Sequence, residues 1–262
     1  MFSNVPMGNS SIIGSAKWSM TVTGHYPKEA FASINASKGP DDDDLYSFVR
    51  THILEGIPYV FEQCPLVYDK VRYFIASELK LLHNDIKLTG SAKLGFSLAP
   101  DKWLQEYAPE TSDMDFYIIS EPLFDKLEND FKSWKSDIES GSLLANTERE
   151  TQIWTDNLLR VPRTIRSGFI NPRLISTNYK WSSKCESVCI KLPKEINSYL
   201  KPYGFSTTAH RCSLRVYKDR LSAINRIFIN VRDAISKGCN KRNKSSFGTN
   251  LQLLLSQHNC MF

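Results

Sequence analysis

Thr-Ser-Asp-Met-Asp-Phe-Tyr-Ile at residues 111–118 is the segment that decides the fold of this chain. Asp113 and Asp115 are two positions apart among strand-forming residues, so a strand places both carboxylates on one face, about 7 Å apart. Two carboxylates at that separation repel each other unless a divalent cation lies between them. The segment therefore predicts a strand that carries a metal-binding acid pair.

A second segment, Leu-Thr-Gly-Ser-Ala-Lys at residues 88–93, precedes the acid pair. The apolar residues Ile86 and Leu88 predict a short strand, and Gly90-Ser91 then leads into the start of a helix. Backbone N–H groups at such a turn are suited to bind a phosphate. We expect Lys93, or a basic residue from the second half of the chain, to offset the charge of that phosphate.

Together the two segments resemble the motif of the nucleotidyltransferase superfamily, the DNA polymerase β-like enzymes. That motif is an apolar residue, Gly-Ser, a spacer, and then Asp-x-Asp between apolar residues. Gly90, Ser91, Asp113 and Asp115 match it residue by residue, over a stretch of roughly residues 84–120. The 21 residues between Ser91 and Asp113 exceed the usual spacer. We therefore expect residues 100–110 to be an insertion.

The resemblance implies an α+β fold, in which a small mixed sheet is flanked by helices and a C-terminal helical part closes the cleft. It implies Mg²⁺ or Mn²⁺ bound by Asp113 and Asp115, and an NTP or dNTP whose phosphates are bound at Gly90 and Ser91. The expected enzyme moves a nucleoside monophosphate from that nucleotide, such as ATP, to an acceptor hydroxyl. Compact bacterial members often belong to antiviral (anti-phage) defence or toxin–antitoxin systems, and this chain is expected to be such a member.

The third acid of the family, carried on a later strand, is not obvious, and two residues compete for its place. Glu186 lies in a segment, 185–192, that fits a strand, but it also fits a helix-capping box with Ser183. Asp219 follows the better strand, 212–217, and also fits the cap of the next helix. If neither serves, the site holds its metals with two acids or is degenerate. The alternative function is then a nucleotide- or RNA-binding protein that acts as a partner-regulated subunit.

Charge is distributed unevenly along the chain. Residues 101–158 hold 14 acidic and 5 basic residues, whereas residues 160–184 hold six basic residues and no acid. Residues 211–244 hold ten basic residues against two acidic ones. An acidic half that faces a basic half suits a cleft for a polyphosphate or a nucleic-acid backbone. We therefore expect a nucleic acid or oligonucleotide as acceptor; the alternative for the basic residues is a solvated surface.

Periodicity divides the chain into four parts. These are an irregular arm at 1–40, the core with the catalytic motif at 41–145, a basic half at 146–236 that closes the cleft, and a basic linker and tail at 237–262, through which a protein partner is expected to bind. Helices are expected over 44–56, from Pro65 to Leu82, over 121–139, from Thr147 to about Arg160, and from Asp219 to Ile235. Strands are expected at 212–217 and at 169–170, and 174–175 is expected to be a short strand or loop.

The composition gives no sign of a membrane or an export route. No apolar run reaches the length of a membrane span, and the first 20 residues lack the apolar stretch of a signal peptide. The six cysteines are scattered without Cys-x-x-Cys pairs, as is typical of reduced thiols. We expect a cytoplasmic location and no membrane partner.

Overall fold

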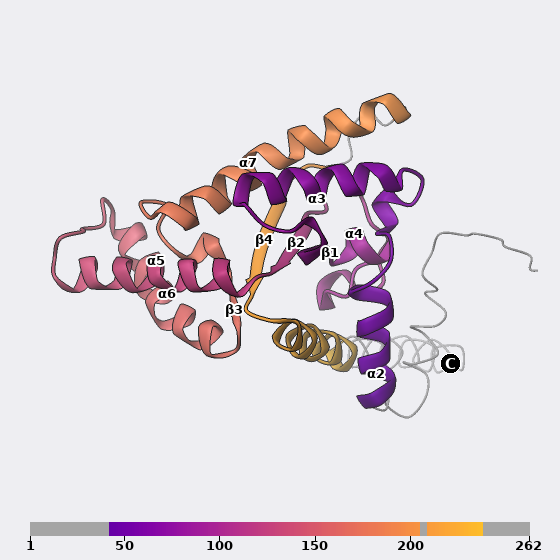
Figure 1. The fold of residues 1–262 in the computed structure, drawn as a ribbon. Coiled ribbons are helices and arrows are strands. Elements are labelled where there is room, and N and C mark those ends of the chain that lie inside the picture. The colour runs from indigo at the N-terminus through magenta and orange to yellow at the C-terminus, as the bar shows by residue number, and fades with distance from the viewer. Residues whose placement is uncertain (1–41, 205–208, 238–262) are drawn as a thin grey trace, which may run out of the picture.

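The computed structural model describes residues 42–204 and 209–237, and it shows an α+β fold built on one four-stranded mixed sheet (Figure 1). The strands are β1 (Ile86–Thr89), β2 (Met114–Ile119), β3 (Phe169–Ile170) and β4 (Cys212–Tyr217), in the order β1-β2-β4-β3. β1 runs antiparallel to β2, β2 runs parallel to β4, and β3 runs antiparallel to β4. The small mixed sheet expected from the sequence is confirmed. The expected arm at 1–40 and the tail at 238–262 lie outside the described residues.

One face of the sheet packs against three long helices, α3 (Pro65–Leu79), α5 (Glu121–Glu139) and α7 (Lys180–Leu200). Leu88, Phe116 and Leu214 come from adjacent strands and are buried in this layer. Because side chains alternate along a strand, the residues between them point to the opposite face. α3 and α7 contact each other over the sheet (Figure 1).

The opposite face of the sheet packs against α2 (Asp42–Phe48), the π-helical turn η1 (Val49–Ile53) and a helix formed by residues 220–237. Tyr117 and Tyr217 from the strands belong to this second core. The ring of Tyr46 on α2 stacks on Phe228 of the 220–237 helix, with 3.9 Å between centroids. α2 and the 220–237 helix are far apart in the sequence. They lie side by side over the sheet face that also carries Asp115 (Figure 1).

α6 (Glu148–Arg166) follows α5 and is capped by the predicted Thr147, whose Oγ1 accepts a hydrogen bond from the N–H of Glu150 at 3.1 Å. The Glu150 carboxylate accepts from the N–H of Asn146 at 2.8 Å, so only one half of the predicted capping box forms. The helix also continues through Pro162, beyond its expected end near Arg160.

The shorter elements are η2 (Tyr59–Phe61), η3 (His83–Asp85), α4 (Ser91–Leu94), η4 (Pro100–Lys102), η5 (Pro172–Leu174) and η6 (Lys201–Tyr203).

Two expectations about individual elements are wrong. α3 ends at Leu79 because Lys80 adopts a left-handed conformation, φ +58°, and Leu82, expected in the core, is 73% exposed. Segment 185–192 lies inside α7 and is not a strand. Its buried residues recur at helical spacing, and they are Cys185, Val188, Cys189 and Leu192. None of the described helices is both long and apolar enough to cross a membrane.

We predict that Leu79→Ala lowers the free energy of unfolding by about 2–5 kcal/mol, because it leaves a cavity in the core formed by α3, α7 and the sheet. Leu79 is 1% exposed, whereas Leu66 on the same helix is 69% exposed. Leu66→Ala is therefore the matched control and is expected to change stability by less than about 0.5 kcal/mol. Urea unfolding of both variants is the measurement, and equal losses would contradict the assigned burial of α3.

Candidate functional site

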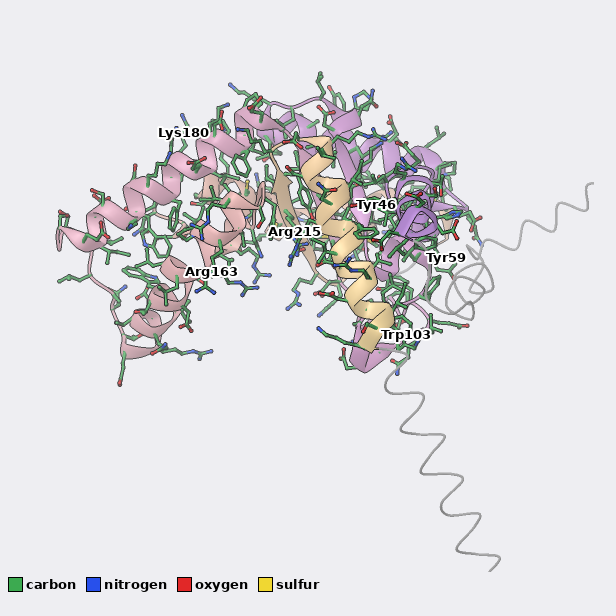
Figure 2. The ribbon with its side chains drawn as sticks, turned by 90° about the horizontal axis from the view of Figure 1, so that it is seen from below. Tyr46, Tyr59, Trp103, Arg163, Lys180 and Arg215 are labelled. Atoms are coloured by element: carbon green, nitrogen blue, oxygen red, sulfur yellow. The ribbon has the colours of Figure 1, made fainter. Side chains whose placement is uncertain are left out.

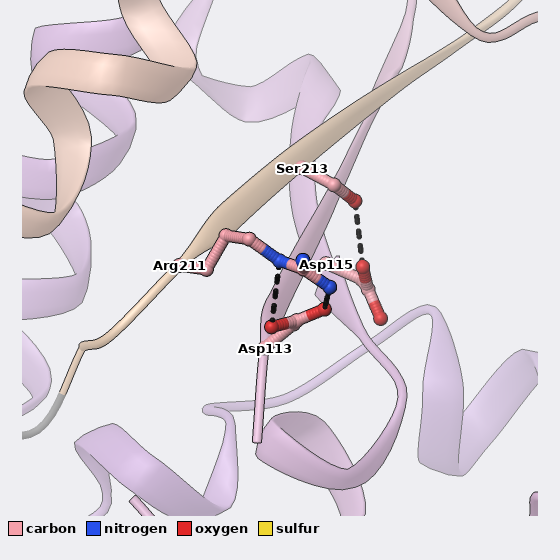
Figure 3. A network of polar contacts seen from close by, with 4 residues as sticks. All are labelled: Asp113, Asp115, Arg211 and Ser213. Carbon is pink, nitrogen blue, oxygen red and sulfur yellow. Dashed lines mark hydrogen bonds and ion pairs between the residues drawn. The ribbon is translucent and has the colours of Figure 1, made fainter. Parts of the chain in front are cut away.

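Asp113 and Asp115 lie at the start of β2, and each is bound by a residue of β4 or of its approach (Figure 3). In the parallel register Asp115 lies opposite Ser213, whose Oγ donates to Oδ1 of Asp115 at 2.6 Å. The Arg211 guanidinium donates from Nε to Oδ1 of Asp113 at 3.0 Å and from its terminal nitrogen to Oδ2. This hydrogen-bonded pairing raises the pKa of Arg211 above its usual range. The acid pair predicted from sequence thus shares one sheet face with a basic residue and a hydroxyl.

Neither of the two candidates for a third acid lies beside this pair. Glu186 lies on α7, where it faces Arg173 with 3.8 Å between the charged atoms. Asp219 accepts a hydrogen bond from the N–H of Ser222 at 2.7 Å and so caps the 220–237 helix. Among residues 42–204 and 209–237, no cluster of three or more Asp, Glu, His or Cys side chains is arranged to hold a metal ion. The residue of β4 that pairs with Asp115 is Ser213.

This donor set fits a pair of divalent metal ions poorly. Mg²⁺ takes six oxygen ligands in a nearly ideal octahedron, and carboxylates are its usual protein ligands. Here Arg211 donates to both oxygens of Asp113, and Ser213 donates to Oδ1 of Asp115. Of the four carboxylate oxygens of the pair, Oδ2 of Asp115 is the one that these hydrogen bonds do not occupy. The binding of Mg²⁺ or Mn²⁺ at this site therefore stays a prediction.

Gly90 lies directly beside Asp115 and needs to be glycine. Its φ is +72°, a conformation that residues with a side chain rarely adopt. A Cβ at this position would be 3.2 Å from Oδ2 of Asp115. Thr89, the preceding residue, pairs with Asp115 between β1 and β2, and Ser91 begins α4. The structure therefore brings Gly90 and Ser91 together with Asp115, as the motif implied.

Lys93 is turned away from this group. Its side chain is 1% exposed, and its Nζ donates to the carbonyl oxygen of Gly56 at 2.9 Å and to that of Glu55. Burial is the main reason that the pKa of the Lys93 ammonium falls to about 8. Lys93 thus fixes the 55–56 turn against α4, and this placement gives no support to the expectation that it offsets phosphate charge.

Two adjacent pockets meet at Asp115. The larger, about 520 Å³, is lined by Gly90, Asp115 and Ser213 and by residues of β4 and the 220–237 helix. The smaller, about 470 Å³, is lined by Asp113, Asp115, Arg211 and the loop of residues 97–112. This loop contains most of the long spacer, and a bridge between Phe96 and Glu106 closes it. The expected insertion therefore forms one wall of the second pocket.

Sequence reasoning missed two arginines of the larger pocket, Arg215 on β4 and Arg226 on the 220–237 helix. Their guanidinium carbons lie 5.5 and 5.0 Å from the centroid of the Phe169 ring. Alternation along the predicted strand 212–217 could have placed Arg211, Ser213 and Arg215 on one face. No sequence signal could have found Arg226, because its place depends on how the helix crosses the sheet.

Segment 160–184 contributes Asn171 to the larger pocket, but its basic residues line neither pocket. Arg160, Arg163 and Arg166 are exposed on α6, and none of them lines either pocket. Figure 2 labels Arg163 on α6 and Arg215 on β4. A nucleic-acid contact through this segment stays a prediction.

Comparison of the chain with models of protein families, with curated protein sequences and with solved structures finds no match. The assignment of the site therefore rests on its own residues and geometry.

We predict that Gly90→Ala destabilises the protein more than Gly141→Ala does. Both glycines have a positive φ, +72° and +73°, so both substitutions strain the backbone. A Cβ at position 141 meets nothing within 4 Å, whereas a Cβ at position 90 meets Asp115. Urea unfolding measures the difference, which should shrink when Asp115→Ala is added. If the difference in stability between Gly90→Ala and Gly141→Ala is the same with and without Asp115→Ala, then a side chain at position 90 does not contact Asp115.

The buried ammonium of Lys93 leads to a pH prediction. The pKa of Lys93 is 10.5 in the unfolded reference and about 8 in the folded chain. Between these values the unfolded state binds more protons, so the free energy of unfolding should rise as pH increases from about 8 to 10.5. Urea unfolding over this pH range should show the rise in the wild type and not in Lys93→Met. Lys194→Met, at an exposed position of α7, should keep the wild-type slope; parallel curves for all three proteins would contradict the prediction.

Proposed function

We propose that this chain is a nucleotide-binding protein whose core is related in arrangement to the polymerase β-like nucleotidyltransferases but lacks their full set of acids. The ligand is a nucleoside triphosphate or a deoxynucleoside triphosphate, held at the junction of the two pockets beside Asp115. The Gly90-Ser91 turn and the Asp-x-Asp strand support the likeness, because the fold places them side by side. The volume of the larger pocket also suits a ligand of nucleotide size.

The observation that carries this proposal is the residue opposite Asp115. The resemblance places a third acid on a later strand, and β4 is the later strand that adjoins β2 in the parallel register. Its residues 212–217 contain no acid, and Ser213 stands where a carboxylate would share a ligand with Asp115. A hydroxyl that donates to Asp115 consumes a lone pair of this carboxylate, whereas a metal ion needs one.

Nucleotidyl transfer to an acceptor hydroxyl is the second candidate function. Two observations favour it: Asp113 and Asp115 share a sheet face beside Gly90, and the ion pair between Asp113 and Arg211 is accessible to solvent. The side chains of Arg211 and Asp113 are 61% and 30% exposed, and exposed ion pairs contribute little stability. Arg211 can therefore leave Asp113 at little cost. In this case the acceptor is a nucleic acid or oligonucleotide, and the setting is a cytoplasmic anti-phage defence or toxin–antitoxin system.

A binding assay and a transfer assay, run on the same protein, separate the two functions. The full chain is incubated with each labelled NTP or dNTP and Mg²⁺ or Mn²⁺, the products are resolved by size, and nucleotide affinity is measured in parallel. We expect binding without product. Product that forms in the wild type and disappears in both Asp113→Ala and Asp115→Ala would establish the second candidate. The absence of both binding and product would contradict both.

Replacement of Ser213 gives a sharper prediction. Ser213→Asp adds a carboxylate beside Asp115, so nucleotide affinity in this variant should become dependent on Mg²⁺ or Mn²⁺. Ser213→Asn has nearly the same size as the aspartate variant but no charge, and it is expected to gain no metal dependence. The measurement is isothermal titration calorimetry with ATP, with and without metal. Metal dependence already present in the wild type would show that two acids suffice.

A further inference from the structure

We propose that the larger pocket binds the phosphate chain of its nucleotide through Arg215 and Arg226, without a metal ion. This inference rests on the proposed nucleotide-binding function and names the groups that recognise the phosphates. Arg215 comes from β4 and Arg226 from the 220–237 helix, so two separate elements bring their guanidinium groups to one cavity of about 520 Å³.

The two guanidinium groups converge on a single aromatic ring. Their central carbons lie 5.5 Å and 5.0 Å from the ring centroid of Phe169, on β3. A ring face attracts a cation, and this contact holds both groups near the cavity wall. Two like charges brought this close repel each other, so an anion between or beside them lowers the electrostatic energy of the pocket.

Neither guanidinium group is neutralised by the protein in the part of the chain that the structure describes. No carboxylate forms an ion pair with Arg215 or Arg226 there. The Nε atom of Arg226 is buried and has no hydrogen-bond partner among these residues. Of the two acids that line the cavity, Asp115 accepts a hydrogen bond from Ser213, and Asp233 forms no ion pair with Arg215 or Arg226 among the described residues. A buried donor without a partner is costly, and a ligand oxygen removes that cost.

A buried hydroxyl in the same cavity is also unpartnered. Tyr117 is 1% exposed and lines the cavity, and its phenol oxygen has no partner in residues 42–204 and 209–237. Burial raises the pKa of this phenol well above its usual range, so it stays a hydrogen-bond donor. Tyr117 lies opposite Arg215 in the strand pairing of β2 with β4.

The donors identify a phosphate chain as the ligand group. A guanidinium group offers two parallel N–H groups that match the oxygens of a phosphate, and its charge does not depend on pH in the physiological range. Leu98, Ile227 and Val231 make part of the cavity wall apolar, and this part suits a base. Arg215 is two residues beyond Ser213, about 7 Å along the strand, so the pocket extends from Asp115 and Gly90 to the two arginines beside β3.

Calorimetric titration of the full chain with ATP, GTP and inorganic tripolyphosphate in EDTA tests the inference. The wild type should bind in EDTA, and Mg²⁺ should change its affinity less than threefold. Arg215→Gln and Arg226→Gln should each weaken binding in EDTA by roughly tenfold to a hundredfold, because each loses a charged donor. Arg163→Gln, at an exposed position of α6 outside both pockets, should bind like the wild type.

Each outcome decides between the inference and its alternatives. If the wild type loses binding in EDTA and regains it with Mg²⁺, the metal-free inference is overturned but the proposed nucleotide binding stands. This part of the test needs no variant. Unchanged affinity in both Arg→Gln variants also overturns it, provided that circular dichroism shows them folded. Should either variant fail to fold, Arg215→Lys and Arg226→Lys replace it and should also weaken binding, since lysine lacks the paired donors. The failure of the wild type to bind any of the three probes overturns the proposed function as well.

Discussion

The parallel pairing of β2 with β4 is the constraint on which the site depends. In this register Cys212, Leu214 and Val216 point into the core under α3 and α7, and they are almost fully buried. A slip by one residue would turn these side chains toward the pockets and bury Ser213 and Arg215 in the apolar core. The cost of burying a guanidinium without a partner forbids that slip. The apolar side of β4 thus fixes which polar residues face Asp113 and Asp115.

That register gives the site a charge balance unlike that of a metal centre. A metal site gathers carboxylates and lets the cation neutralise them, whereas here β4 and its approach supply Arg211 and Arg215 themselves. Asp113 is neutralised by Arg211, and the larger pocket keeps Arg215 and Arg226 for a ligand. The positive charge that the proposed nucleotide ligand would need is thus supplied by the chain's own arginines. A hydroxyl at position 213 completes this arrangement, since a carboxylate there would face Asp115 without compensation.

Local features of the fold could be predicted from the sequence, and features set by distant contacts could not. α5 and β4 have their predicted bounds, because Ser120 and Pro122 mark the start of α5 and alternation marks β4. For segment 185–192 the sequence left a strand and a helix start open, because its helical spacing is evident only over the full length of α7. Asp219 caps the 220–237 helix, which is one of its two predicted roles, whereas Glu186 lies inside α7. The inward turn of Lys93 depends on the 55–56 turn, and the pocket position of Arg226 depends on the crossing of a helix over the sheet. Neither contact leaves a mark in the nearby sequence.

The ion pair between Arg211 and Asp113 connects the two candidate functions physically. Arg211 borders the smaller pocket together with Asp115, so a phosphate that enters there competes with Asp113 for the guanidinium group. Because the pair is exposed, the competition costs little, and a bound triphosphate would release the Asp113 carboxylate. Occupation of the pocket and the availability of Asp113 are then thermodynamically linked, and each favours the other. Without a ligand Asp113 is thus held by Arg211, and a nucleotide bound as proposed would be the ligand that changes this state.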